Sequence, residues 1–163
     1  MARLCKGGVK LRDQVNRRWP KRDKASDGWI GDRAHSERIS DHNPNKAGVV
    51  HAIDIDEGLG TYANGRTARL LANQILDYAA SGLAGASRLK YVVYENRIAS
   101  GTYRKTFWSW RHGNWGHEAH IHVSFTSAAD RDGSVFPLPI LTRSPLKKAR
   151  WRRDLSKARK ANK

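Results

Sequence analysis

Three histidines that lie within six residues, His117, His120 and His122, form the part of the sequence best suited to chemistry. Residues 120–125 alternate polar and apolar side chains, which predicts a β-strand because successive side chains of a strand point to opposite faces. His120 and His122 then share one face with Ser124, and the apolar face can be buried. Because histidine is the commonest metal ligand, we interpret this strand as one that presents metal ligands. The alternative is a half-exposed strand with surface histidines.

A second polar cluster lies upstream of this strand. Residues 49–55 are rich in β-branched and apolar side chains and predict a strand, whereas residues 43–47 are typical of a loop. His42 before the loop, Asp54 on its strand and His122 together make a set of two imidazoles and one carboxylate. Such a set leaves a fourth tetrahedral position for water, which is the pattern of a catalytic zinc site. The single cysteine of the chain excludes a structural zinc site built from several thiolates.

In these motifs the chain resembles the LAS group of zinc peptidases, which includes D-alanyl-D-alanine carboxypeptidases, the penicillin-insensitive murein endopeptidase and hedgehog domains. The family pattern is Ser-x-His, a glycine, Ala-x-Asp and, later, His-x-His on a strand. This sequence carries the pattern in that order, as Ser40-x-His42, Gly48, Ala52-x-Asp54 and His120-x-His122. The resemblance covers residues 10–126 and is closest to small phage peptidoglycan peptidases.

The resemblance implies that His42, Asp54 and His122 bind Zn²⁺, which would activate a water and polarise a peptide carbonyl. It also implies a hydrolase of the phage endolysin type that cleaves a peptide bond of the peptidoglycan stem or cross-bridge. Eleven residues separate His42 from Asp54, more than is usual in the family. An insertion in the loop at 43–47 accounts for this difference, because its Pro and Asn residues suit a loop.

The catalytic residues that the resemblance implies are His117 and His120. His117 matches a further histidine that the murein endopeptidase type carries before its His-x-His pair. Histidine titrates near neutral pH and can pass a proton from water to a leaving amine. We expect His117 to be the general base with His120 as its helper, while His120 and Glu118 stay open as alternative bases. Ala119 stands where some carboxypeptidase members carry an acidic base, so this chain departs from that branch.

The remaining sequence predicts an α+β fold with a small, mostly antiparallel sheet flanked by helices, which the resemblance implies is of the hedgehog and D,D-peptidase type. Helices are expected over residues 10–22 and from a cap at Asn64 to about residue 80. Strands are expected at residues 89–94, 97–99 and 107–111. Three tryptophans either line a substrate cleft or pack in the core: Trp108, Trp110 and Trp115.

Three further polar residues lie near the motifs. His35 either lines the cleft or lies on the surface. His51 is expected to face away from Asp54 and to be a packed structural histidine. Asp56 is interpreted as a loop or cap residue and is the reserve metal ligand if Asp54 is not one.

The chain is strongly basic, with 31 Lys and Arg against 15 Asp and Glu and a net charge of +16. Residues 143–163 hold ten Lys and Arg and one Asp, so we divide the chain into a catalytic domain at 1–142 and a basic tail at 143–163. Trp151, Leu155 and Ala158 can form one face of a short amphipathic helix in this tail. A basic tail suits a nucleic acid, an anionic membrane or an anionic wall polymer, and the alternative is a disordered tail.

The sequence contains no apolar run long enough for a transmembrane helix and no visible secretory signal. Cys5 is the single cysteine and cannot form an internal disulfide, which fits synthesis in a reducing compartment. We therefore expect a monomer that is made in the host cytoplasm and acts on peptidoglycan at the cell wall after release. No specific protein partner is expected.

Two other classes of function are considered. Asp41-His42-Asn43, together with the basic charge, is faintly similar to metal-dependent nucleases that bind nucleic acid through a basic surface. Such sites place their histidine base on a hairpin before a metal-binding helix, whereas the histidines here lie on a predicted strand. A non-catalytic binding module of the same fold is the third possibility, and the intact ligand set argues against it.

Overall fold

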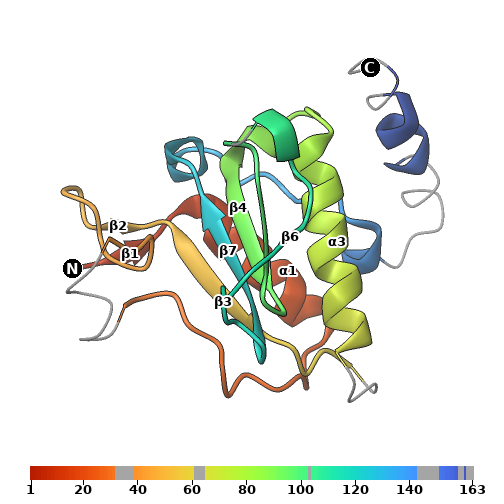
Figure 1. The fold of residues 1–163 in the computed structure, drawn as a ribbon. Coiled ribbons are helices and arrows are strands. Elements are labelled where there is room, and N and C mark those ends of the chain that lie inside the picture. The colour runs from red at the N-terminus through yellow and green to blue at the C-terminus, as the bar shows by residue number, and fades with distance from the viewer. Residues whose placement is uncertain (32–38, 61–64, 103, 143–150, 158–159, 161–163) are drawn as a thin grey trace.

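The computed structural model describes residues 1–31, 39–60, 65–102, 104–142, 151–157 and 160 (Figure 1). Its centre is a five-stranded sheet whose paired strands are all antiparallel, in the order β3-β7-β4-β5-β6. These strands are β3 (Ala52–Asp56), β4 (Leu89–Tyr94), β5 (Arg97–Ser100), β6 (Arg111–His112) and β7 (His120–Phe125). A short parallel pair, β1 (Arg3–Leu4) and β2 (Val49–Val50), lies beside it. The predicted α+β fold with a mostly antiparallel sheet is confirmed.

Two helices, α1 (Lys6–Arg18) and α3 (Arg66–Ala80), pack against one face of the sheet (Figure 1). Their apolar stripes, which include Leu11 and Ile75, join Ile53 and Val123 of the strands in one buried core. Because side chains alternate along each strand, the opposite face carries the polar residues of β3 and β7. The described chain also contains four short 3₁₀ helices: η1 (Ala86–Arg88), η2 (Arg104–Thr106), η3 (Ser127–Asp130) and η4 (Pro139–Leu141).

Helix α1 begins four residues before the predicted start at residue 10. The Cys5 Sγ accepts a hydrogen bond from the Gly8 N–H at 3.4 Å and caps the helix, an unusual role for a cysteine. Burial raises the pKa of Cys5 to about 11, so the thiol stays protonated at neutral pH. Gly7 is needed because a Cβ there would lie 2.9 Å from the Cβ of Ala129.

Two predicted strands differ from the structure. The strand expected at 49–55 is interrupted at His51, where the chain passes from β2 to β3. The strand expected at 107–111 is wrong for residues 107–110, because only Arg111 of that range belongs to β6. Trp108 instead has a φ of 47°, donates its N–H to the Ser100 carbonyl and is buried in the core. Burial of this indole outweighs the β propensity of the aromatic run.

Asp56 lies at the end of β3 and fixes the loop before it. Its Oδ2 accepts hydrogen bonds from the Ser26 N–H at 3.0 Å and the Ser26 hydroxyl at 2.6 Å, and its Oδ1 accepts one from the Gly58 N–H at 2.7 Å. Burial opposes ionisation of this carboxyl, but these bonds outweigh it and lower the pKa of Asp56. Asp56, which the sequence analysis interprets as a loop or cap residue, is thus the last residue of β3 and binds the loop at Ser26 and the turn at Gly58.

Replacing Asp56 with alanine is expected to lower the free energy of unfolding by about 1–3 kcal/mol at pH 7, because the partly buried Ser26 and Gly58 donors lose their acceptor. The lowered pKa means that the carboxylate stabilises the fold above the unfolded value of about 3.9, and that this contribution is lost as the pH falls through the folded value. Urea unfolding at pH 7 and at pH 2.5 measures the difference. Exposed Asp13 replaced by alanine is the control. An equal loss at both pH values would contradict the assignment.

The structure describes part of the basic tail. Residues 151–157 are helical, with Trp151 and Leu155 buried, whereas Ala158 lies outside the described residues. Asn64 also lies outside them, and the N-cap of α3 is Gly65 rather than the predicted Asn64. The boundary between the domain and the tail stays a prediction.

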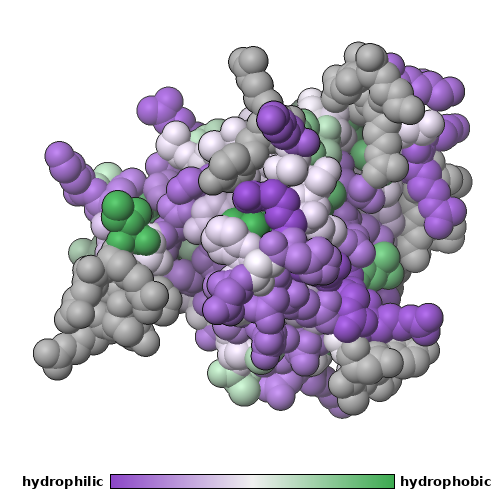
Figure 2. All heavy atoms as spheres, viewed as in Figure 1, coloured by the Kyte–Doolittle hydropathy of each residue, from purple (hydrophilic) through white to green (hydrophobic). Residues whose placement is uncertain are grey.

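No helix within the described ranges is both long and apolar enough to cross a membrane. Hydrophilic residues dominate the face seen in Figure 2, where apolar side chains form only small separate patches.

Candidate metal centre

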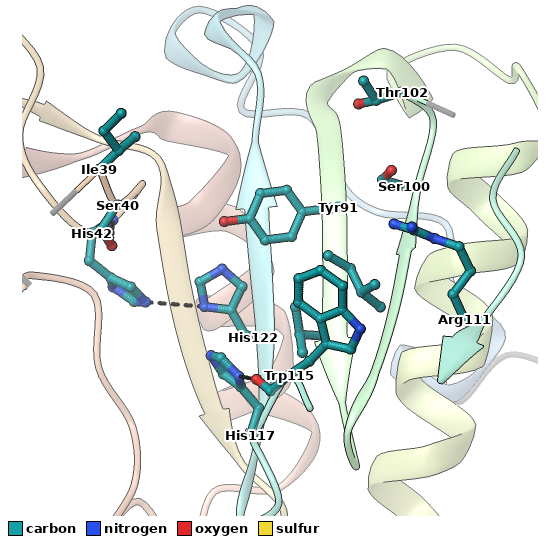
Figure 3. Close-up of a pocket in the computed structure, with 12 residues that line it drawn as sticks. Ile39, Ser40, His42, Tyr91, Ser100, Thr102, Arg111, Trp115, His117 and His122 are labelled. Carbon is teal, nitrogen blue, oxygen red and sulfur yellow. Dashed lines mark hydrogen bonds between the residues drawn. The ribbon is translucent and has the colours of Figure 1, made fainter. Parts of the chain in front are cut away.

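His42, the first residue of the metal centre in the chain, is held by a short turn. The Ser40 hydroxyl accepts the His42 N–H at 3.2 Å, and the His42 carbonyl accepts the Gly31 N–H at 2.9 Å. The imidazole also bonds to the backbone of Trp29. This bond orients the ring, and the His42 Nε2 points to the open face of the sheet, toward His122 (Figure 3).

Asp54 and His122 are brought together by strand pairing. The two residues lie directly opposite each other in the β3–β7 register, and both side chains point to the face that the helices leave open. His122 Nδ1 lies 3.0 Å from Asp54 Oδ1, and His42 Nε2 lies 3.2 Å from both Asp54 Oδ2 and His122 Nδ1. His42, Asp54 and His122 therefore form a cluster with the geometry to hold a metal ion.

The spacing of the ligand atoms is close to that of a tetrahedral ion. Bonds of about 2.0–2.1 Å at tetrahedral angles place neighbouring ligand atoms about 3.3 Å apart. Here the two imidazole nitrogens lie 3.2 Å apart, His122 Nδ1 lies 3.0 Å from Asp54 Oδ1, and His42 Nε2 lies 3.2 Å from the other carboxylate oxygen, Oδ2. His122 Nε2 lies 2.9 Å from the Ser124 hydroxyl. In a metal-bound form, the proton of His122 would lie on Nε2 and be donated to Ser124, which would leave the Nδ1 lone pair for the metal. Metal-bound histidines usually have such a partner for their second ring nitrogen.

The protonation states of the cluster also suit a metal. Burial raises the pKa of Asp54, but hydrogen bonds from His122 and His42 outweigh it and hold that pKa well below its ordinary value. Burial lowers the pKa of His122, which favours the neutral imidazole. Burial also lowers the pKa of His42, but the hydrogen bond and charge of Asp54 outweigh it and leave the pKa raised. Because zinc binds the neutral imidazole, the raised pKa of His42 makes metal binding weaken as the pH falls.

His117 and His120 lie beside this cluster. The ring centroid of His117 is 4.9 Å from that of His122 and 5.0 Å from that of His120. His120 Nε2 lies 3.6 Å from Asp54 Oδ1. His117 Nδ1 lies 2.8 Å from the Trp115 carbonyl, which can only accept, so this nitrogen carries the proton. The His117 Nε2 is then the basic atom of the ring.

A tight turn fixes the backbone of His117. Glu95 and Asn96 both have positive φ angles and connect β4 to β5. Their N–H groups donate to the carbonyls of His117 and Gly116, and the Asn96 Oδ1 accepts the Gly116 N–H at 2.8 Å. His117 itself has a φ of 59°, an uncommon conformation for a residue other than glycine. Such strain persists where the surroundings enforce it, often at functional sites.

A pocket of about 750 Å³ opens next to the metal centre (Figure 3). Its described lining is Ile39, Ser40, His42, Tyr91, Val93, Ile98, Ser100, Thr102, Arg111, Trp115, His117 and His122. Tyr91 stacks on His122 with a centroid separation of 5.4 Å, and burial raises the pKa of Tyr91 to about 12. Three of these residues, Tyr91, Ser100 and Arg111, were not predicted from the sequence. The strand alternation at 89–94 was the one signal for Tyr91, because it places that residue and Val93 on one face.

The other residues considered in the sequence lie in different surroundings. Of the three tryptophans, Trp115 lines the pocket, Trp108 is buried, and Trp110 packs against the core and donates to Asn73 Oδ1 at 2.8 Å. Glu118 is exposed and accepts a bond from Asn96.

The remaining polar residues near the motifs lie apart from the metal centre or outside the described ranges. His51 Nε2 lies 2.6 Å from Asp130 Oδ1, so His51 is a partly buried structural residue. His35 lies outside the described residues.

Comparison of the chain with protein-family models, curated proteins and solved structures gives no match.

Proposed function

We propose that the protein is a zinc-dependent peptidase that hydrolyses a peptide bond of peptidoglycan, in the manner of a phage endolysin. One observation carries the proposal: His42, Asp54 and His122 converge beside a pocket that a third imidazole, that of His117, also lines. The choice of peptidoglycan comes from the resemblance of these motifs to the LAS group of zinc peptidases.

Under this proposal His42, Asp54 and His122 hold the zinc. Bound zinc would supply a Lewis acid that activates water and polarises the scissile carbonyl. With two nitrogens and one carboxylate as protein ligands, a coordination position remains for water or substrate, as catalytic zinc sites require.

The imidazoles beside the metal centre move the protons. The His117 Nε2 accepts a proton from the attacking water and returns it to the leaving amine, because its Nδ1 proton is held by the Trp115 carbonyl. Burial lowers the pKa of His120, so this ring is neutral at pH 7 and can donate a hydrogen bond to the developing oxyanion.

The surface charge supports an anionic target. The net charge of +16 favours association with a polyanion, and wall polymers or the membrane surface of a bacterial envelope are of that kind. The basic tail at 143–163 would concentrate the enzyme there. We propose this binding as an aid to catalysis rather than as its cause, because no described residue of the tail belongs to the metal centre.

Purified cell walls test the proposal. We expect the protein to reduce the turbidity of the walls, and we expect this loss of turbidity to stop when a chelator removes the metal and to resume when zinc is added. Mass spectrometry of the fragments should identify new amino termini. Asp54→Ala protein is the matched inactive control. If the walls stay intact and nucleic acid is nicked in the same buffer, the proposal of a peptidase is wrong and that of a metal-dependent nuclease is favoured.

A further inference from the structure

Arg111 lies at the far end of the same row of residues as the metal ligands. Strand pairing places Asp54 opposite His122, His122 opposite Val93, Val93 opposite Ile98, and Ile98 opposite Arg111. Paired residues point to the same face of a sheet, so this row forms a continuous floor. The metal ligands Asp54 and His122 lie at one end of this floor, and the guanidinium of Arg111 lies at the other.

The guanidinium of Arg111 is part of the pocket wall. Arg111 Cζ lies 5.9 Å from the ring centroid of Trp115, and Figure 3 shows the side chain directed toward Ser100. Ser100 is two residues from Ile98 on β5, which makes it a diagonal neighbour of Arg111 on the same face. The Ser100 hydroxyl is buried, and no described residue forms a hydrogen bond with it. A buried hydroxyl without a partner is costly, and rotation about χ1 can direct it to a bound ligand.

The charge of the pocket points to an anion. No carboxylate is among the described residues that line it, and Arg111 is the one permanently charged side chain there. We propose that Arg111 and Ser100 form a subsite for a carboxylate of the bound peptide, an inference that rests on the proposed function. A guanidinium matches a carboxylate through two parallel hydrogen bonds, and the Ser100 hydroxyl can donate a third.

The sheet also sets where on the substrate this carboxylate must lie. Three strand spacings of about 4.8 Å separate the backbones of His122 and Arg111, or about 14 Å. Both side chains extend into the pocket, so two or three peptide residues at about 3.5 Å each can span the remaining gap. The recognised carboxylate is therefore two or three residues from the scissile bond, and the subsite selects among stem peptides.

A phosphodiester is the other anion that an arginine binds. A nucleic-acid strand needs a track of several cations along its backbone, whereas the described lining of this pocket offers one arginine, which follows the apolar side chains of Val93 and Ile98 in the row. A concave pocket of about 750 Å³ fits a ligand of a few residues. The observations favour the peptide carboxylate.

Equilibrium binding to the whole chain, with its metal removed by a chelator, tests the subsite without turnover. The probes are two stem pentapeptides, one with free carboxylates on the D-Glu residue and at the C-terminus, the other with both as amides. Calorimetry is expected to show that the acid binds at least about tenfold more tightly than the amide. Arg111→Gln should remove this preference, Arg111→Lys should keep part of it, and Ser100→Ala should reduce it. Arg12→Gln, which removes the same charge from α1, should leave it unchanged.

Each outcome bears on one proposal. A preference that persists in Arg111→Gln protein, or no binding of either peptide, would overturn the subsite, and stronger binding of a single-stranded oligonucleotide would reassign Arg111 to a phosphodiester. Wall hydrolysis without an acid preference would leave the peptidase standing and reject the subsite. An acid preference without hydrolysis would keep the subsite and reject the peptidase.

Discussion

Replacing Asp54 with alanine is expected to reduce zinc affinity by more than about 100-fold, because even the loss of an outer support of a metal ligand costs 10–100-fold. Asp54 is the residue on which both His42 and His122 converge, at 3.2 Å and 3.0 Å. Its removal leaves two imidazoles without the anion that compensates the charge of the metal. Competition with a chromogenic chelator measures the affinity, and circular dichroism checks the fold.

Asp56→Asn is the matched control for this experiment. The two carboxylates lie two residues apart on β3, but Asp56 is bonded to Ser26 and Gly58. Zinc affinity should therefore be nearly unchanged in Asp56→Asn protein. An Asp54→Ala protein that is folded and binds zinc like the native chain would refute the assignment of Asp54 as a ligand.

The second large effect is expected at His117, where alanine should spare the metal and lower kcat by about 10²–10⁴-fold. The His117 ring lies beside the cluster and lines the pocket, and its Nδ1 is bonded to Trp115. The experiment combines zinc content with the rate of wall hydrolysis. Exposed His112 on β6, replaced by alanine, controls for the loss of an imidazole.

The same experiment separates the candidates for the base. A fall in zinc content in His117→Ala protein would make His117 a metal ligand, and the second possible cluster of Asp54, His117 and His120 would then describe the site. His120→Ala is expected to slow turnover less than His117→Ala. Glu118→Gln should be close to neutral, because Glu118 is exposed and bonded to Asn96.

Local patterns predicted the individual elements of the site better than their assembly. The alternation of His120, His122 and Ser124 with apolar residues identified β7 and its buried face, because strand periodicity is visible in the sequence. The register that sets Asp54 opposite His122 depends on contacts between distant segments, so here the metal set rested on residue types and on the resemblance. Arg111 carried no local signal, since its place at the pocket follows from the strand order.

The failed predictions have a related cause. Residues 107–110 have the composition of a strand, but the core takes up Trp108 and leaves its backbone at a positive φ. The start of α1 was missed because Cys5 is not a usual cap and because Gly7 and Gly8 disfavour a helix. In both places tertiary packing outweighs local propensity.

The bonds between the turn at Glu95-Asn96 and the segment at Gly116-His117 determine which part of the site unfolds first. That segment is held by a few peripheral backbone bonds, whereas His122 lies on a strand paired on both sides. Amide hydrogen exchange should therefore report two separate openings, with Gly116 and His117 exchanging far earlier than the amides of β7. On warming, the protein would lose turnover while it still retains its metal, so residual zinc would be a poor measure of surviving activity.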